Sequence, residues 1–473
     1  MKIVNLKNPV MASWLREQGL RLDAPPFLSG AIEARKLLEQ LPVKKEPLAS
    51  LTNGYNGGIY NGPMFRRNYV TDREHGVPFL TSSGILLADL STLPLLSKKD
   101  AMSSRLSYLQ IREGMTLISC SGAIGRMAYT RPEMDGMWSS QDVLKVVPNP
   151  DQILPGYLYA FLSSKFGESL VVGGTYGAII QHIEPHHIAD LPVPRLGGGI
   201  ETRVHRLIQE AAALRSRFQA ELETATCEFF EAAGLPDLYQ IRWHSQPRDL
   251  AFIVHDLNTT SLRALNFAPR FTNIVEKLQS VPYKTLGKIC IHGQLSSGVR
   301  FKRIDCDPAH GVKLIGQRQA FWLRPEGRWI SPRQAPPGVF VTDETIMVAA
   351  QGTLGENEVF CQPILVTGRW LDFAYTQHFL RILSGDSTFP GAFLFAFLRS
   401  EAVFRCFRSM SIGSKQQDLH PALIAQFPVP TCSPDNRMRI AERVRHAFRM
   451  RDDADSKEDQ ALALLESAIE EAA

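Results

Sequence analysis

The sequence predicts an α+β protein with two tandem mixed α/β domains, separated and followed by long helices that pair as an antiparallel coiled coil. Three observations predict this fold class: an internal repeat, a change from strand-like to helix-like segments inside each copy, and a long amphipathic segment after each copy. With 473 residues the chain exceeds one ordinary core. The predicted boundaries are residues 1–196 for the first domain, 197–235 for the central helix, 236–431 for the second domain and 432–473 for the C-terminal helix.

The repeat is clearest in residues 175–194, TYGAIIQHIEPHHIADLPVP, which match residues 411–430, SIGSKQQDLHPALIAQFPVP, without a gap at an offset of 236 residues. The identical positions are Gly177/Gly413, Gln181/Gln417, Pro185/Pro421, Ile188/Ile424, Ala189/Ala425, Pro192/Pro428, Val193/Val429 and Pro194/Pro430. Upstream segments match in the same order, for example HGVPFL with HGVKLI and GPMFRR with GVRFKR. The duplication therefore covers most of the chain.

The first part of each copy is typical of strands, because short β-branched or aromatic runs lie between Gly, Pro and Asp residues. Residues 116–120 and 142–147 are two such runs. A helix is predicted from Pro155, since proline suits the first helical turn and apolar residues then recur along one face. The second copy repeats this change at Pro390.

A long segment with helical periodicity follows the sequence LPVP or FPVP that closes each copy, because proline there interrupts regular structure. A helix from about residue 200 to 233 would be roughly 50 Å long. An apolar stripe on both segments predicts that the helices pack together. The stripes are Leu207, Ala211, Leu214, Phe218, Leu222, Ala225 and Phe229, and Val444, Ala447, Ala454, Leu462, Leu465 and Ile469.

The composition is that of a folded protein, with 44% hydrophobic and 21% charged residues. The net charge of +4 is compatible with a polyanionic partner without requiring one. Seven cysteines without a C-x-x-C pair, and the lack of a signal peptide or an apolar run of membrane-spanning length, predict a reduced cytoplasmic protein. His182, His186 and His187 are expected to be solvated or capping rather than metal ligands, because their repeat partners are Asp418, Ala422 and Leu423.

This alternation of two mixed domains with two long helices resembles the specificity subunits of type I restriction-modification systems, over nearly the whole chain. Local strings occur in the order of that family: RLDA at residues 21–24, then VPFLTSSGI, GMTLISCSGAIGR and HIEPHHIADLPVP. The second copy departs from the RLDA motif and has RALN at residues 263–266, so the start of its domain is less defined.

The resemblance implies a non-catalytic subunit that binds a bipartite DNA target, one half-site per domain, with a spacer fixed by the paired helices. It also implies that the helices dock two methyltransferase subunits, to which restriction, translocase or other defence subunits can be added. These methyltransferases would flip and methylate a base, so S-adenosylmethionine is expected in them and no cofactor in this chain. The alternatives are a self-contained DNA-acting defence enzyme and a protein-binding scaffold on the same duplicated fold.

No catalytic motif favours the enzyme. The chain has no NPPY-like or DPPF-like tetrapeptide and no Gly-rich loop followed by a ribose-binding acid. Residues 293–298 have the glycine spacing of a P-loop, but Val299 and Arg300 stand where Lys and Ser or Thr are needed. The spacing of a nuclease core is too loose to be excluded, although no candidate stands out.

The repeat also predicts which residues read DNA, because equal positions should hold the common fold and unequal polar positions could read different half-sites. The main candidates are the loop before Pro185 or Pro421, the proline shared by the two copies, and the polar triplets at residues 81–83 and 317–319. Two paired basic dipeptides suit phosphates, although a solvated turn explains them nearly as well. Ser121, Arg126, Gln351 and Glu356 are weaker candidates, since their glycines could simply form a hairpin. The predicted DNA-binding residues are Arg66, Arg67, Thr81, Ser82, Ser83, Thr175, Tyr176, Gln181, Lys302, Arg303, Gln317, Arg318, Gln319, Ser414, Lys415, Gln416 and Gln417.

Overall fold

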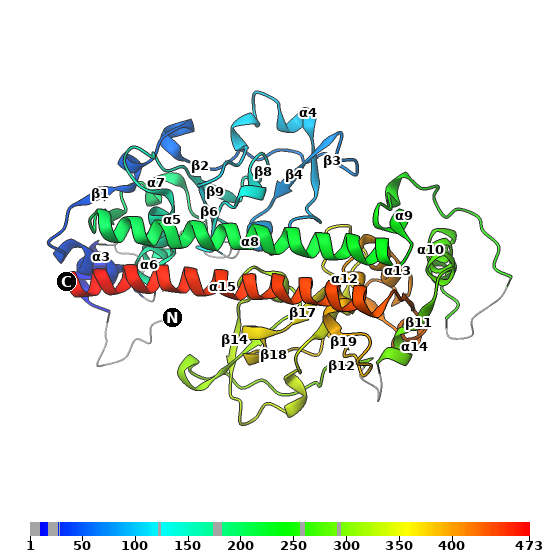
Figure 1. Ribbon diagram of the computed structural model, residues 1–473. Helices are drawn as coiled ribbons and strands as arrows, with labels where there is room; N and C mark the ends of the chain where they lie inside the picture. Colours follow the sequence, from blue (N-terminus) through cyan, green and yellow to red (C-terminus); the bar gives the residue numbers. More distant parts are fainter. Residues whose placement is uncertain are drawn as a thin grey trace. The chain divides into compact units, whose positions relative to one another are not determined.

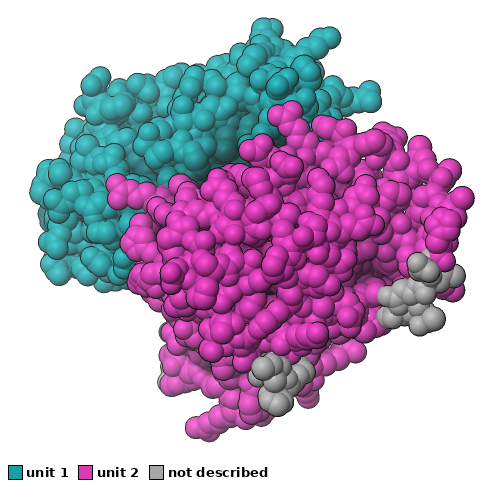
Figure 2. Space-filling view, turned by 45° about the vertical axis from the view of Figure 1, so that its right-hand side comes forward, with its two compact units in different colours: residues 1–216, 453–473 teal, residues 217–452 magenta. Residues whose placement is uncertain are grey.

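The computed structural model describes residues 10–17, 27, 29–121, 124–173, 182–255, 261–290 and 295–473. The chain forms two compact units, which Figure 2 shows in two colours: residues 1–216 with 453–473, and residues 217–452. Each unit contains one copy of the repeat together with a part of each long helix. The sequence-based boundaries, in contrast, treat the two helices as segments of their own.

Most of the described strands of the first unit form two four-stranded sheets. One sheet has the order β2 (Ile59–Tyr60), β9 (Val143–Val146), β6 (Thr116–Ser119), β7 (Met127–Tyr129), with antiparallel neighbours. The other has the order β3 (Tyr69–Val70), β5 (Leu95–Ser97), β4 (Gly76–Leu80), β8 (Trp138–Ser139), and its β4–β8 pair is parallel. Strands β6 and β9 are buried along their whole length, which explains their continuous apolar runs.

The second unit repeats this topology. Its first sheet has the order β12 (Leu295–Ser297), β19 (Phe379–Ile382), β15 (Thr345–Ala349), β17 (Pro363–Val366). The next has the order β14 (Gly327–Ile330), β13 (Val312–Ile315), β18 (Ala374–Tyr375), and here too the pair of β13 with β18 is parallel. A small third sheet contains β16 (Gln351–Gly352), β21 (Gln417–Leu419) and β20 (Ser411–Gly413). The glycine spacing at residues 293–298 is thus not a phosphate loop, because residues 295–297 are strand β12.

Helices close each copy, as the sequence predicts. In the first unit α5 (Pro155–Ser163) begins at the expected proline and is followed by α6 (Lys165–Gly173) and α7 (Pro185–Ile188). Their counterparts are α12 (Gly391–Leu398), α13 (Glu401–Ser409) and α14 (Pro421–Ala425). Helix α12 is buried on all sides, which fits its sequence GAFLFAFL. The first unit also contains α1 (Ala12–Glu17), α3 (Ala31–Gln40) and α4 (Lys98–Ala101), and the second contains α9 (Pro236–Tyr239), α10 (Pro269–Gln279) and α11 (Leu286–Ile289).

The Pro-x-Pro sequence that ends each copy is a short strand in a two-stranded ribbon. In the first unit β10 (Pro192–Pro194) pairs with β1 (Lys45–Pro47), and in the second β22 (Pro428–Pro430) pairs with β11 (Tyr283–Thr285). A two-stranded ribbon tolerates prolines because a strand at an edge can leave one side unpaired. Each ribbon thus brings the last strand of a copy back to a strand near its beginning.

The two long helices are α8 (Gly198–Ala232) and α15 (Pro434–Ala472), drawn in green and red in Figure 1. In the first unit Lys457 of α15 contacts Glu210 of α8. In the second unit Arg443 contacts Glu221 at 2.5 Å and Glu228 at 3.1 Å. A residue further along α8 contacts a residue earlier in α15 in each unit, as shown by Arg215 with Asp455 and by Glu228 with Arg439. Within each unit the helix segments therefore run antiparallel, and the predicted pairing is confirmed.

The stripe residues of the helices belong to the cores of the units. Phe218, Leu222, Ala225 and Phe229 are buried in the second unit, where Phe229 stacks on Phe397 with 4.9 Å between ring centroids. Leu465 and Ile469 are buried in the core of the first unit, and Leu462 is partly buried against it. The fold-class prediction of mixed domains with long paired helices is thus confirmed.

Candidate nucleic-acid interface

The same arginine–glutamine contact occurs in both units. In the first unit Arg67 donates a hydrogen bond to Oε1 of Gln141 at 3.0 Å. In the second unit Arg303 donates to Oε1 of Gln377 at 3.4 Å. Both pairs lie at the 236-residue offset of the repeat. In each case the arginine follows the first strand of the sheet that contains β9 or β19, which is β2 in the first unit and β12 in the second. The glutamine lies in the turn that leads into β9 or β19.

Backbone hydrogen bonds next to this contact are also repeated. The amide of Cys120 donates to the carbonyl of Asp142 at 3.0 Å, and the amide of Ala350 donates to the carbonyl of His378 at 3.0 Å. The carbonyl of Cys120 accepts from the amide of Ile183 at 3.1 Å, and that of Ala350 accepts from the amide of Leu419 at 3.2 Å.

The residues beside these bonds are therefore equivalent in the two units. Asp142 corresponds to His378. The bridge that joins Ser121 to His182 corresponds to the pairing of Gln351 with Asp418.

We call the arginine–glutamine pair, Arg67–Gln141 in the first unit and Arg303–Gln377 in the second, the frame. Different polar side chains surround the frame in the two units. In the first unit Arg67 also contacts Asp142 at 3.2 Å. In the second unit Nδ1 of His378 lies 2.5 Å from Oε1 of Gln351, and Nε2 of Gln351 donates to Asp418 at 3.3 Å. Burial and the positive charges of Arg303 and Arg300 lower the pKa of His378, and Asp418 acts in the opposite direction.

An open hollow of about 590 Å³ adjoins the arginine–glutamine pair of the first unit. Its lining is Met64, Phe65, Arg66, Arg67 and Gln141. Arg66 is exposed, whereas Arg67 is half-buried between Gln141 and Asp142. Lys302 and Arg303 repeat this alternation, since Lys302 is exposed and Arg303 is half-buried. The outer residue of each dipeptide is thus available to a phosphate, and the inner one holds the frame.

The predicted loop of the second unit is the turn of a β-hairpin. Strands β20 and β21 pair with Gly413 opposite Gln417, and Ser414, Lys415 and Gln416 are exposed at the tip. Gly413 has φ +104°, a conformation that favours glycine, which explains why a glycine stands at this position. The hairpin borders the polar chain because Asp418, the partner of Gln351, lies on β21.

Gln417, one of the predicted DNA-binding residues, is buried inside the second domain. Its side chain is 3% exposed, and Oε1 accepts a hydrogen bond from Arg263 at 2.5 Å while Nε2 donates to the carbonyl of Ser414. Both polar ends are used inside the domain, so this residue shapes the hairpin. Its equivalent Gln181 in the first copy lies outside the described residues, as do the predicted residues Thr175 and Tyr176.

The two polar triplets align with a shift of one residue from the sequence-based pairing. Ser83 precedes the short helix Gly84–Leu86, and Arg318 precedes the short helix Gln319–Phe321. Ser83 therefore corresponds to Arg318, and Ser82 to Gln317.

Within these triplets, Thr81 and Gln317 serve the fold. Thr81 accepts a hydrogen bond from the amide of Gly84 at 3.2 Å. Gln317 exchanges two bonds with the backbone of Gln351, at 2.6 and 3.2 Å. Arg318 is exposed, and Ser82, Ser83 and Gln319 are half-buried.

Five residues of this surface were not predicted from the sequence: Gln141, Gln377, Asp142, His378 and Asp418. A signal was available, because the offset of 236 residues places the two glutamines opposite each other as identical residues. Gln351 was considered only as part of a hairpin. In the structure it connects two candidate segments, the triplet at residues 317–319 and the hairpin.

Three histidines considered as metal ligands do not form a site. Nδ1 of His187 accepts a hydrogen bond from the amide of Glu184 at 2.9 Å, which caps helix α7. His186 is exposed. Across the residues that the structure describes, no group of three His, Cys, Asp or Glu side chains is placed to hold a metal ion. No described helix is long and apolar enough to cross a membrane.

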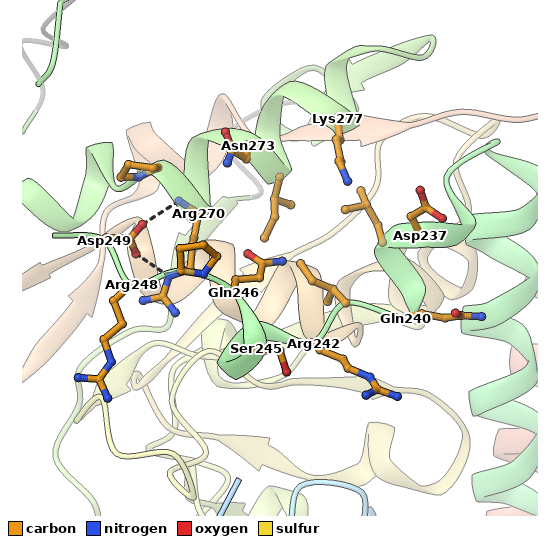
Figure 3. A pocket seen from close by; sticks show the side chains of 15 residues that line it. Asp237, Gln240, Arg242, Ser245, Gln246, Arg248, Asp249, Arg270, Asn273 and Lys277 are labelled. Atoms are coloured by element: carbon orange, nitrogen blue, oxygen red, sulfur yellow. Dashed lines mark hydrogen bonds and ion pairs between the residues drawn. The ribbon is translucent and has the colours of Figure 1, made fainter. Parts of the chain in front are cut away.

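A pocket of about 540 Å³ in the second unit, between α9 and α10, was not predicted (Figure 3). The side chain of Asp249 accepts from the amide of Arg270 at 2.9 Å and from its Nε at 2.7 Å. Asp249 thus occupies the N-terminus of α10, the position where an external anion would bind. Arg270 also lies over the ring of Trp243 at 4.1 Å, so these contacts fix the segment that precedes α10.

Comparisons with known proteins give structural similarities alone. No protein-family model and no curated protein matches the chain. A crystal structure of the S subunit of a type I restriction-modification system from M. genitalium is similar over 92% of this chain and 96% of that chain, with 12% identity and a TM-score of 0.37. A structure from a study of complex assembly and conformational transition of the type I R-M system covers 91% and 98%, and the HsdS subunit from Thermoanaerobacter tengcongensis covers 90% and 96%. Both have 12% identity and a TM-score of 0.27.

Proposed function

We propose that this chain is a sequence-specific DNA-recognition subunit in which each repeat domain reads one half of a bipartite target. The observation that carries the proposal is the arginine–glutamine pair, Arg67–Gln141 and Arg303–Gln377, which is the same in both domains. Asp142 and Ser121 accompany this frame in the first domain, and His378 and Gln351 accompany it in the second. A constant frame with variable polar neighbours is what two domains need in order to bind the same backbone and read different bases.

Exposed cations support binding to duplex DNA. Arg66 and Lys302 occupy equivalent exposed positions next to the frame, and Lys415 is exposed at the tip of the hairpin in the second domain. Lysine and arginine at such positions bind phosphates and position a protein on the duplex without reading its sequence. The frame residues are half-buried and held by hydrogen bonds, so they fix the positions of the polar residues around them.

The chain would act through partners. We infer that the long helices dock two methyltransferase subunits, that these bind S-adenosylmethionine, and that the helices set the spacing between the two half-sites. Restriction or other defence subunits would join the same complex. A helix can serve as such a surface where small exposed residues allow close approach, and α8 has Ala213 and Ala220 at exposed positions.

Selection from a pool of randomised duplexes by the purified full-length chain tests the recognition function. The expected result is enrichment of two short motifs at a fixed separation. Recovery of unselected duplexes at low salt would overturn sequence recognition, and failure to retain any duplex would favour the scaffold alternative. Modification or cleavage of plain DNA by the chain alone would favour the enzyme alternative.

Copurification tests the docking function. The variants Ala213→Arg and Ala220→Arg should lose coexpressed methyltransferase subunits while they still bind DNA, because a long charged side chain blocks close approach. Ala49→Arg, at an exposed position outside the helices, is the matched control and should retain the partners. Equal recovery with all three variants would contradict docking on this face of α8.

A further inference from the structure

The pair Asp142 and His378 lies at equivalent positions directly after the glutamine of the frame. The two residues differ in charge and shape, yet each has an atom that can accept a hydrogen bond. The carboxylate of Asp142 accepts from Arg67 with Oδ2, and its side chain is 32% exposed. What His378 can do depends on which ring nitrogen carries the proton.

Asp418 fixes that proton through Gln351. An ionised carboxylate can only accept hydrogen bonds, so the group of Gln351 that faces Asp418 must be its amide nitrogen, at 3.3 Å. The oxygen of the same amide therefore faces Nδ1 of His378, at 2.5 Å. Because that oxygen only accepts, Nδ1 must carry a hydrogen, and in the neutral ring Nε2 is then an acceptor.

The surroundings favour the neutral ring. His378 is half-buried, and Arg303 and Arg300 face it from the segment that follows β12. Burial and these two charges lower the pKa of His378, and they outweigh the opposite effect of Asp418 on β21. Within the part of the chain that the structure describes, Nε2 of His378 has no hydrogen-bond partner.

We propose that residues 142 and 378 are the specificity-determining positions of the two domains, and that each presents a hydrogen-bond acceptor to the exocyclic amino group of an adenine or a cytosine. This inference rests on the proposed function. In the major groove those amino groups are donors, whereas guanine and thymine present acceptors that an acceptor side chain would reject. Gln351 and Asp418 are positioning residues, because they act on the base through the ring of His378.

The test begins with the duplex that the wild-type chain selects from a randomised pool. Each adenine of the second half-site is replaced in turn by purine, which lacks the 6-amino group, and each cytosine by 2-pyrimidinone, which lacks the 4-amino group. One replacement should weaken binding by about tenfold, and its identity decides between the two bases. The variant His378→Ala should bind the replaced and unreplaced duplexes equally, with discrimination in the first half-site intact.

Asp142→Asn should relax the preference at one position of the first half-site only. The control His310→Ala, at an exposed position of the second domain, should leave the preferences in both half-sites unchanged.

Asp418→Asn tests the positioning role. An asparagine both donates and accepts, so Gln351 can turn over and Nε2 of His378 can become a donor. Selection at that position should then broaden to include guanine or thymine, and nitrogen-15 NMR of the ring should detect the second tautomer.

Lower pH provides an independent test of the acceptor role of His378. As pH falls through the lowered pKa of His378, the ring gains a proton at Nε2, so discrimination at that position should be lost while that of Asp142 persists. Unchanged discrimination in His378→Ala and Asp418→Asn, or equal loss at both half-sites, would overturn the inference. A wild-type chain that enriches no motif would instead contradict the proposed function itself.

Discussion

Arg67 donates a hydrogen bond to the side-chain oxygen of Gln141 at 3.0 Å, and the repeat reproduces this bond as Arg303 with Gln377. The contact joins the segment that follows β2 or β12 to the turn before β9 or β19. Under the proposed function, differences between the two half-sites come from the residues around this pair, because the pair itself is the same in both domains.

The outer basic residues should contribute affinity without selectivity. Arg66→Ala and Lys302→Ala are expected to weaken binding by a similar factor for all duplexes, since phosphates carry no sequence information. Each variant should reduce the slope of log K against log salt concentration by about 1. Binding titrations at several salt concentrations measure this slope, with Lys277→Ala on α10 as the control. A changed base preference in either variant would contradict the phosphate role.

Gln417 should affect stability rather than selectivity. Its replacement by alanine removes a buried side chain and leaves half-buried Arg263 without one of its acceptors, so the free energy of unfolding should fall by about 1–3 kcal/mol. The neighbouring variant Gln416→Ala, at the exposed hairpin tip, should change it by less than about 0.5 kcal/mol. Urea unfolding followed by circular dichroism compares the two. If Gln417→Ala altered the selected motif at full stability, the residue would read DNA after all.

The helix pairing of the first unit depends on a buried arginine. Arg215 of α8 contacts Asp455 at 2.9 Å and Glu458 at 2.5 Å on α15, and Tyr159 donates to Glu458. Arg215→Ala removes the ion pairs that this buried arginine makes with Asp455 and Glu458 and should lower the free energy of unfolding by about 3–5 kcal/mol. Arg217→Ala, two residues further on and exposed, is the control. A loss below about 1 kcal/mol would show that this cluster does not hold the helices together.

Lys145 should make stability depend on pH. It is fully buried on β9, and burial lowers its pKa from 10.5 to about 7. Between these values the unfolded chain binds a proton that the folded chain does not, so stability rises with pH by about 1.4 kcal/mol per unit. Below pH 7 both states are protonated and the full cost of burying the charge remains.

The variant Lys145→Met should therefore be more stable than the wild type at pH 7, and this advantage should shrink as pH approaches 10. Urea unfolding at a series of pH values measures the difference. Lys99→Met, at an exposed position, should show no such trend. A constant difference across the range would mean that Lys145 keeps an ordinary pKa in the folded protein.

Much of the fold followed from the internal repeat. The helix start at Pro155 and the strands near residues 116 and 142 lie where the sequence predicts them, because local chemistry and burial agree there. Lys145 is different, since a lysine within a strand ordinarily faces water, and only the tertiary packing shows that this one is buried. The repeat also indicates a structural role for Gln417, because it is identical to Gln181 and equal positions are expected to hold the fold.

The candidate site was less accessible to sequence reasoning. Exposed tips such as Lys415 follow from turn chemistry, whereas the frame depends on contacts between residues more than 70 positions apart, such as Arg67 with Gln141. Neither glutamine stands out by itself, because each precedes a strand like many polar turn residues. The role of Gln351 depends on a hydrogen-bonded chain from His378 to Asp418, which no local pattern encodes.

The central claim is that each domain reads its own half-site, and one measurement tests it most directly. Motifs are selected from randomised duplexes by the full-length chain and by the double variant Arg318→Ala/Lys415→Ala, whose changes lie at exposed positions of the second domain. The variant should lose preference in one motif and keep the other unchanged. Equal loss of preference in both motifs would contradict the reading of one half-site by each domain.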